Sequence, residues 1–172
     1  MSDKRRNFTD RRYVYYLTFS VCRRRRLLDL DHPKRIVLGV LNHQLEQMQG
    51  KCIGFVIMPD HVHALLWLPD PHDLRRFIHG WKRMSSFEIQ KWYSEHSPEY
   101  FHEFGPGDRF WQPKSDCFHI YSGAKISEKL EYMHLNPQRA GLVERAVDWR
   151  WSSARWYIQK RSVGVPIDWI EC

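Results

Sequence analysis

The stretch Met58-Pro59-Asp60-His61-Val62-His63-Ala64-Leu65-Leu66-Trp67-Leu68 decides how this sequence folds and what it does. Its apolar content predicts a β-strand, and residues i and i+2 of a strand project from the same face. His61 and His63 therefore project together from one rigid surface. Neutral imidazole is a common metal ligand, so the pair is a candidate for two ligands of a metal site. Two histidines on one strand face also occur on ordinary polar sheet surfaces, so the case depends on what completes the site.

The segments around this strand predict a mixed α and β chain. Residues 13–21 alternate β-branched and aromatic side chains, which predicts a first strand. Apolar residues at helical spacing predict helices over residues 33–49 and 73–93, with a strand over residues 52–58. We expect a loop over 94–108, a strand over about 110–120 and a third helix over 122–135. Asn136-Pro137 is expected to end that helix, since the residue before proline disfavours the α region.

This order predicts an α+β fold. The first six elements, β-α-β-β-α-β, match a ferredoxin-like or RRM-like antiparallel sheet with both crossover helices on one face. Alternation along the histidine strand places His61 and His63 on the opposite, open face, which the additional third helix is expected to cover. We expect the main domain to span residues 1–147. Residues 148–172 form an aromatic and basic C-terminal tail that packs on the domain or extends it.

Composition limits the function classes. The chain has 172 residues, and 27 Lys and Arg against 20 Asp and Glu give a net charge of +7, which favours an anionic partner such as nucleic acid. Hydrophobic residues make up 42%, which excludes a wholly disordered chain. The 4 cysteines are far apart and contain no C-x-x-C pair, which argues against a zinc ribbon or a disulfide framework. No stretch approaches the roughly 20 apolar residues that span a bilayer, so we expect a reduced, soluble, intracellular protein.

The predicted third helix carries the residues that can complete a metal site. Tyr132 and Asn136 are four positions apart and so share one helical face. If this helix lies beside the His61 strand, the Asn136 carboxamide oxygen is a possible third ligand, with the Tyr132 hydroxyl one turn away. The alternative is an ordinary amphipathic helix with Asn136 as its last residue, and the spacing alone favours that alternative.

Several motifs in a fixed order resemble a known family. They are the aromatic first strand, Met58-Pro59-Asp60-His61-Val62-His63, Trp111-Gln112 with Asp116, Tyr132-x-x-x-Asn136-Pro137-x-Arg139-Ala140-Gly141-Leu142-Val143, and Trp151-Ser152-Ser153. Together they resemble the REP-associated tyrosine transposases, a group of the single-tyrosine HUH transposases. The resemblance implies that His61 and His63 are the histidine pair, Asn136 the third metal ligand and Tyr132 the nucleophile.

The resemblance also implies a reaction and a cofactor. Tyr132 attacks a phosphodiester of single-stranded DNA, keeps the 5′-phosphate and frees a 3′-OH that can later rejoin the DNA. The implied substrate is a REP-like hairpin with an adjacent single-stranded recognition tetranucleotide. Two imidazoles alone also suit zinc; the resemblance decides for Mg²⁺ or Mn²⁺. It further implies a bacterial cytoplasmic protein associated with the nucleoid.

Contacts with DNA are expected from basic groups. Charge runs are usually solvated, but four consecutive arginines beside the sheet favour phosphate contacts, whereas the basic face of the second helix is evenly balanced between the two roles. The candidates are Arg23, Arg24, Arg25, Arg26, Arg75, Arg76, Lys82, Arg83 and Arg139. Trp149 and Trp156 are candidates for stacking on unpaired bases, and Trp151 is expected in the core.

Two rival functions stay open from the sequence. The first is a non-catalytic nucleic-acid-binding module on the same scaffold. The second is a different metallohydrolase, which requires an additional carboxylate ligand from Asp60 or Asp116. The short link between the last strand and the third helix favours a monomer that completes its site within one chain, and a dimer with a shared site is the alternative.

Overall fold

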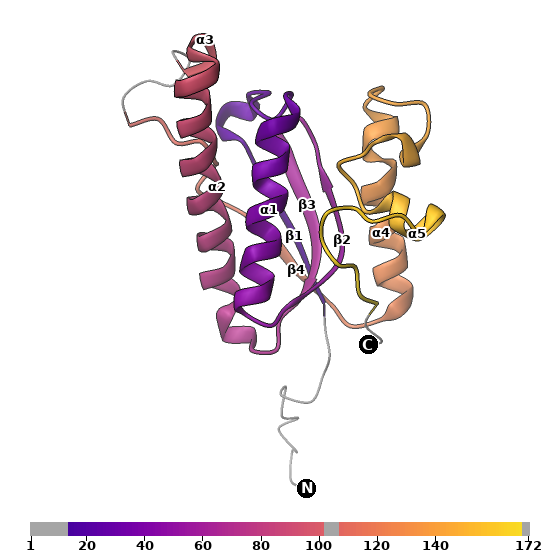
Figure 1. The fold of residues 1–172 in the computed structure, drawn as a ribbon. Coiled ribbons are helices and arrows are strands. Elements are labelled where there is room, and N and C mark those ends of the chain that lie inside the picture. The colour runs from indigo at the N-terminus through magenta and orange to yellow at the C-terminus, as the bar shows by residue number, and fades with distance from the viewer. Residues whose placement is uncertain (1–13, 102–106, 170–172) are drawn as a thin grey trace, which may run out of the picture.

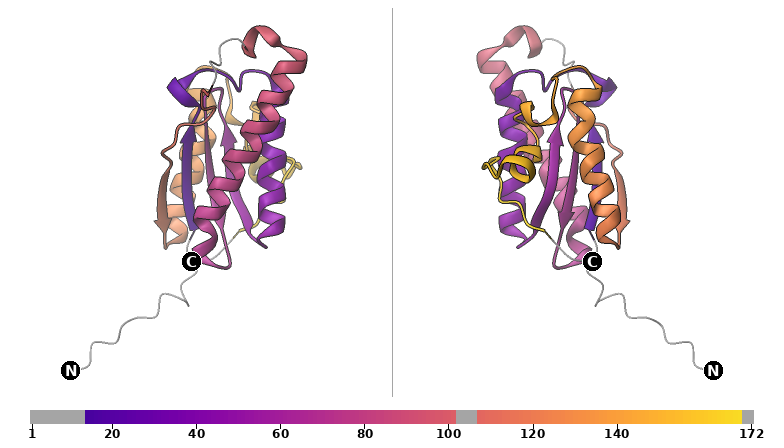
Figure 2. Two further views of the ribbon diagram at one scale, coloured as in Figure 1. Left: turned by 90° about the vertical axis from the view of Figure 1, so that its left-hand side faces the viewer. Right: turned by 90° about the vertical axis from the view of Figure 1, so that its right-hand side faces the viewer.

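The computed structural model describes residues 14–101 and 107–169. Strands β1 (Val14–Ser20), β2 (Lys51–Ile57), β3 (His61–Trp67) and β4 (Asp116–Ile120) form one antiparallel sheet in the order β2-β3-β1-β4. Helices α1 (Asp31–Gln47) and α2 (Leu74–His96) cover one face, and α4 (Gly123–Arg139) lies on the other (Figures 1 and 2). The predicted ferredoxin-like order, with an extra helix on the open face, is confirmed.

Side-chain alternation divides the interior into two cores, one on each face of the sheet. On β3, Val62, Ala64 and Leu66 belong to the larger core under α1 and α2. Leu65 points the other way and packs with residues of α4, namely Ile126, Leu130 and Met133. The faces predicted for the histidine strand are therefore those observed, and the helix that carries Tyr132 rests on a core of its own.

The predicted end of the third helix was wrong. Helix α4 continues through Asn136 and Pro137 to Arg139. Proline lacks only its own N–H, which removes one hydrogen bond to the carbonyl of Met133 but leaves its carbonyl available. That Pro137 carbonyl accepts from Leu142 N at 2.9 Å, and the Asn136 carbonyl accepts from Ala140 N at 2.9 Å. Asn136 is consequently held in regular helical backbone rather than at a frayed terminus.

Other predicted boundaries also changed. The last strand is only Asp116–Ile120, because Pro113 cannot donate to a ladder and the chain before it contacts the sheet through one isolated bridge, Trp111 with Val21. Helix α1 (Asp31–Gln47) begins and ends two residues before the helix predicted over residues 33–49. In the segment expected as a loop, α2 runs to His96 and α3 covers Pro98–Phe101, while residues 102–106 lie outside the described part.

The C-terminal segment packs against strand β2. After the short helices η4 (Ala146–Asp148) and α5 (Ala154–Gln159), Ile167 forms a parallel bridge with Cys52. Ser152 bridges Val56, and Trp151 is buried as expected. Two further 3-10 turns complete the description, η2 (Cys22–Arg24) and η3 (Pro71–Asp73). Within the described ranges, no helix combines the length and apolar character needed to span a membrane.

Candidate active site

His61 and His63 stand side by side on the α4 face of β3, with ring centroids 4.8 Å apart. Strand alternation puts both rings on this face, and β1 lies antiparallel beside them, so that Ser20 opposes His61 and Thr18 opposes His63. His63 is buried and His61 is partly buried. The predicted pair is thus held by the central strands of the sheet rather than by a loop.

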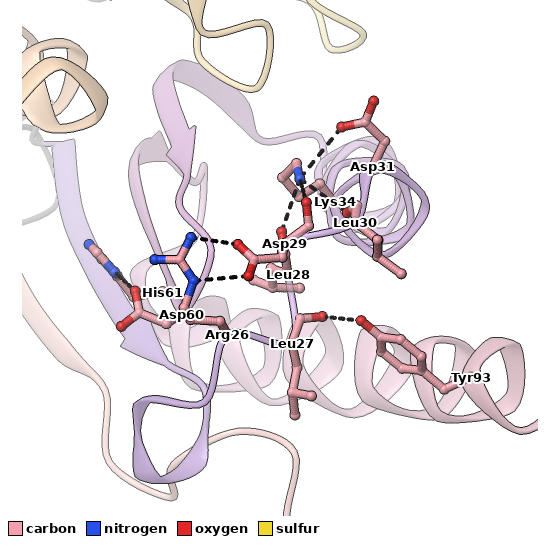
Figure 3. A network of polar contacts seen from close by, with 10 residues as sticks. All are labelled: Arg26, Leu27, Leu28, Asp29, Leu30, Asp31, Lys34, Asp60, His61 and Tyr93. Carbon is pink, nitrogen blue, oxygen red and sulfur yellow. Dashed lines mark hydrogen bonds and ion pairs between the residues drawn. The ribbon is translucent and has the colours of Figure 1, made fainter. Parts of the chain in front are cut away.

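The Nδ1 atom of His61 is bonded to a carboxylate. Asp60 Oδ1 lies 2.6 Å from His61 Nδ1 and accepts a hydrogen bond from its N–H group (Figure 3). Arg24 Nε lies 2.9 Å from the other oxygen of Asp60, so the carboxylate is itself held in place. With the proton on Nδ1, the lone pair of the ring is on Nε2. This is the usual arrangement behind a metal-binding histidine, in which the partner fixes tautomer and orientation.

The Nδ1 atom of His63 is bonded to hydroxyl groups of β1. Thr18 Oγ1 lies 2.7 Å away and the Tyr16 hydroxyl 3.0 Å away, and either oxygen can accept the Nδ1 proton. Tyr16 also stacks on the ring at a centroid distance of 5.7 Å. Both imidazoles therefore use Nδ1 for internal hydrogen bonds, which leaves both Nε2 atoms for a ligand.

Electrostatics keep both rings neutral. Burial, with the nearby His61, Arg24 and Lys129, lowers the pKa of His63 to about 3. Burial also lowers the pKa of His61, although Asp60 opposes this shift. A neutral imidazole is the form that binds a metal ion. The pair is therefore ready to coordinate at neutral pH without first losing a proton.

Tyr132 projects from α4 toward this pair. Its ring centroid lies 6.2 Å from that of His63, and 45% of the residue is exposed, so its hydroxyl group is accessible to a substrate. Lys129 Nζ and Arg139 Cζ lie 5.6 Å and 5.5 Å from the centre of the Tyr132 ring. Both cations therefore lie beside the aromatic ring, at the distance of a cation–π contact.

Asn136 lies one helical turn after Tyr132 and is partly buried. Its Nδ2 is buried, and no hydrogen-bond partner for it exists among the described residues. A half-turn of the amide exchanges nitrogen and oxygen, and buried polar atoms normally have partners. A buried amide without a partner, on the same helix face as Tyr132, is therefore available to a ligand.

The rival metallohydrolase requires a carboxylate ligand from Asp60 or Asp116 beside the histidine pair. Across residues 14–101 and 107–169, no cluster of three or more His, Cys, Asp or Glu side chains could hold a metal ion. Asp60 is bonded to His61 and Arg24 instead. Asp116 is exposed on β4, opposite Thr18.

Sequence reasoning missed Tyr16, Thr18 and Lys129. Alternation places Tyr16 and Thr18 on one face of the first strand, which was visible in the sequence. That this face meets His63 depends on the register between β1 and β3. Lys129 is three positions before Tyr132, a helical spacing that could have marked it as a neighbour.

The arginine turn after β1 is split between internal bonds and exposed charge. Arg23, Arg24 and Arg26 are exposed. Arg26 is paired with both oxygens of Asp29, at 2.9 and 2.8 Å (Figure 3). Arg25 is directed inward and donates to the Arg109 carbonyl at 3.2 Å. The turn therefore presents positive charge next to His61, while the hydrogen bonds of Arg25 and Arg26 hold its backbone in place.

Helix α2, which carries the next group of predicted basic residues, lies on the opposite face of the sheet from α4 (Figure 2). Arg75, Arg76 and Arg83 are exposed. Lys82 is partly buried, and its ammonium donates to the Gln112 carbonyl at 2.5 Å and to two further oxygens of the chain before β4, those of Pro113 and Ser115. Its three protons are thus used internally. Of the predicted set, only Arg24 and Arg139 come next to the candidate site.

Comparisons with known proteins point to a family of transposases. Residues 10–135 match the family model described as transposase, IS200-like. A Haemophilus influenzae protein assigned as a REP-associated tyrosine transposase is 23% identical over 98% of this chain and 93% of its own length. The REP-associated tyrosine transposase of Escherichia coli K12 is 26% identical over 67% of this chain and 60% of its own length.

Two solved structures share the fold. One is a REP-associated tyrosine transposase bound to a REP hairpin, with a TM-score of 0.69 and 20% identity over 100% of this chain and 93% of that one. The other, assigned as a transposase of Deinococcus radiodurans R1, has a TM-score of 0.52 and 22% identity over 77% of this chain and 95% of that one. The resemblance drawn from the motifs is confirmed. Since the family model spans most of the sequence, from before β1 to the helix that carries Tyr132, the chain belongs to the IS200-like transposases.

Proposed function

We propose that this transposase cleaves and rejoins single-stranded DNA beside REP-like hairpins through a 5′-phosphotyrosine on Tyr132. His61, His63 and the Asn136 oxygen would hold Mg²⁺ or Mn²⁺. The observation that carries the proposal is the approach of Tyr132 to His63, at 6.2 Å between ring centroids, in a site where both imidazoles are fixed through Nδ1. The hairpin substrate is supported by the REP hairpin bound in a structural relative.

A bound divalent ion would act as a Lewis acid on a phosphodiester oxygen and orient the scissile group. The Tyr132 oxygen attacks phosphorus, so that a Tyr–O–P bond forms and the P–O3′ bond breaks. The phenol proton is lost, and the departing 3′-oxygen takes up a proton from solvent. In the rejoining step a 3′-OH attacks the phosphotyrosine and Tyr132 leaves. Lys129 and Arg139, whose charges lie beside the Tyr132 ring, supply positive charge for the DNA phosphate that Tyr132 attacks.

One chain supplies every residue of the proposed site, which supports a monomer that cleaves with its own tyrosine. We also propose that the protein acts in a bacterial cytoplasm, at the nucleoid. The basic turn beside His61 and Arg139 beside Tyr132 supply the positive surface that DNA requires near the site.

The test is covalent capture. Labelled hairpin DNA with single-stranded flanks is incubated with the protein and Mn²⁺ and resolved by denaturing electrophoresis. We expect a protein–DNA adduct that is absent in Tyr132→Phe and in His61→Ala and present in Tyr121→Phe, whose exposed tyrosine lies outside the site. An adduct that persists in Tyr132→Phe contradicts the assignment. Tight binding without an adduct, across a broad pool of hairpins, supports the non-catalytic binding module instead.

A further inference from the structure

An open cavity lies on the α2 side of the sheet, away from Tyr132. It has a volume of about 610 Å³ and lies between one face of α2 and the chain that leads into β4. This volume falls within the range of roughly 300–1,000 Å³ that is usual for ligand sites. Its described lining residues include Leu74, Arg75, Ile78, Arg83, Arg109 and Phe110.

The lining has the chemistry of a nucleotide site. Arg75, Arg83 and Arg109 are exposed cations at its edge, with His79 beside them, and none of the described residues that line it is acidic. Leu74, Ile78 and Pro113 supply an apolar surface. Cations that surround an apolar surface fit a ligand with a phosphate and a flat base, because one part pairs with arginine and the other packs on carbon.

The cavity wall is fixed before any ligand binds. Lys82 bonds α2 to the Gln112, Pro113 and Ser115 oxygens on the opposite wall. Trp111 Nε1 donates to Ser85 Oγ at 3.0 Å in the same gap. Because both walls are held at a set separation, a ligand does not need to order them, and less of the binding free energy is lost.

Hydrogen bonds connect the chain before β4, which forms one wall of the cavity, to the segment that neighbours the histidine pair. Gln112 N donates to the Ser20 carbonyl at 2.9 Å, and Ser20 pairs with His61. Cys22 N donates to the Phe110 carbonyl at 2.7 Å, and Arg25 donates to the Arg109 carbonyl at 3.2 Å. The arginine turn therefore lies between the two sites. A single strand that leaves the histidine face can pass round the end of β1 along positive charge.

We propose that this cavity binds a nucleotide of single-stranded DNA that flanks the cleaved hairpin, with Arg75 and Arg83 on its phosphates and the base against Leu74 and Ile78. The inference rests on the proposed function for the identity of the DNA. It adds a second contact site, on the opposite face of the sheet, that recognises the unpaired flank rather than the scissile phosphate.

The test compares binding of two probes by fluorescence anisotropy. One is a labelled DNA hairpin, and the other is the same hairpin with a single-stranded oligothymidine extension on its 5′ or its 3′ side. In Arg75→Ala/Arg83→Ala we expect about tenfold weaker binding of one extended probe and under twofold change for the bare hairpin. Loss of two phosphate contacts should also reduce the salt-dependence slope for that probe by about 1.4. Arg76→Ala is the matched control, an exposed arginine of the same helix that does not line the cavity.

A second variant, Ser86→Trp, fills the cavity without removing a charge, and we expect it to weaken the same extended probe. Equal losses for bare and extended probes, or equal effects of Arg76→Ala and the double variant, would reduce the region to a general basic surface and overturn the proposal. Binding is measured without metal, so the result does not depend on Tyr132 chemistry. If wild-type protein forms no adduct yet discriminates the extended probe through Arg75 and Arg83, only the proposed function fails.

Discussion

His134 Nε2 and Ser153 Oγ lie 2.7 Å apart in the interior, on segments separated by 19 positions. His134 belongs to α4, between Tyr132 and Asn136, and points to the opposite side of the helix. Ser153 also accepts from Phe55 N of β2 at 3.0 Å. The C-terminal segment thus connects the helix that carries the proposed nucleophile to the sheet that carries the histidines.

Replacing this serine should destabilise the fold. Ser153→Ala leaves His134 Nε2 and the Phe55 N–H without the hydroxyl that joins them, and we expect the free energy of unfolding to fall by about 1–3 kcal/mol. Urea denaturation measures the change. The control Ser127→Ala, at an exposed position of α4, the helix that carries His134, should stay within about 0.5 kcal/mol of wild type. Equal effects of the two variants would show that the buried link contributes nothing.

The same histidine predicts acid sensitivity. Burial lowers the pKa of His134 to about 4, from an ordinary value of 6.5. Between these two values the unfolded chain binds a proton that the folded chain does not, so stability is complete above pH 6.5 and declines as the pH falls toward 4. The decline from this group is at most about 3 kcal/mol. The free energy of unfolding of His134→Gln should therefore fall less than that of wild type between pH 7 and 4.5. The control His43→Gln, at an exposed position, should show the same fall as wild type. Parallel pH profiles for wild type and His134→Gln would rule out this origin.

Gly54 lets α4 approach the sheet. A Cβ at this position would meet Leu130 Cδ2 at 2.3 Å, too close for any real contact. Gly54→Ala should therefore cost about 1–3 kcal/mol through overpacking. It should also reduce the rate of adduct formation, because Tyr132 moves away from the histidines. Leu130→Val should recover part of both losses in the double variant. Gly39→Ala, where the added Cβ meets nothing within 4 Å, should instead stabilise helix α1 by up to about 1 kcal/mol. A Gly54→Ala protein with wild-type stability and adduct rate would refute the close-approach argument.

Asp60 should set the metal affinity without binding the metal. Asp60→Asn removes the carboxylate that accepts the His61 Nδ1 proton, and we expect Mn²⁺ binding by calorimetry to weaken about 10–100-fold while the fold is retained. Asp116→Asn should leave the affinity unchanged. A large loss of Mn²⁺ affinity in Asp116→Asn would instead support the metallohydrolase alternative, in which this carboxylate is a ligand.

Two inactive variants should not rescue each other. Since His63 and Tyr132 of one chain face each other, a mixture of Tyr132→Phe and His63→Ala should form no more adduct than either alone. Light scattering should show a monomer under the same conditions. Recovery of adduct in the mixture would instead demonstrate a dimer with exchanged helices.

The sequence by itself determined which side chains share one face of a strand or of a helix. Alternation in residues 61–67 placed both histidines on one face, and a spacing of four placed Tyr132 and Asn136 on one helix face. Both follow from the periods of a strand and a helix, which adjacent residues encode. The same local reasoning ended the helix at Asn136-Pro137 and was wrong, because hydrogen bonds after Pro137 continue it.

Tertiary structure alone decided which groups meet. The Thr18 contact with His63 depends on the register of two strands 45 positions apart, and the His134–Ser153 bond depends on how the C-terminal segment folds back. The cavity under α2 requires Lys82 to bridge two segments 30 positions apart. Such contacts follow from packing of the whole chain, in which register and helix position minimise buried unpaired groups and voids, and no local period specifies them.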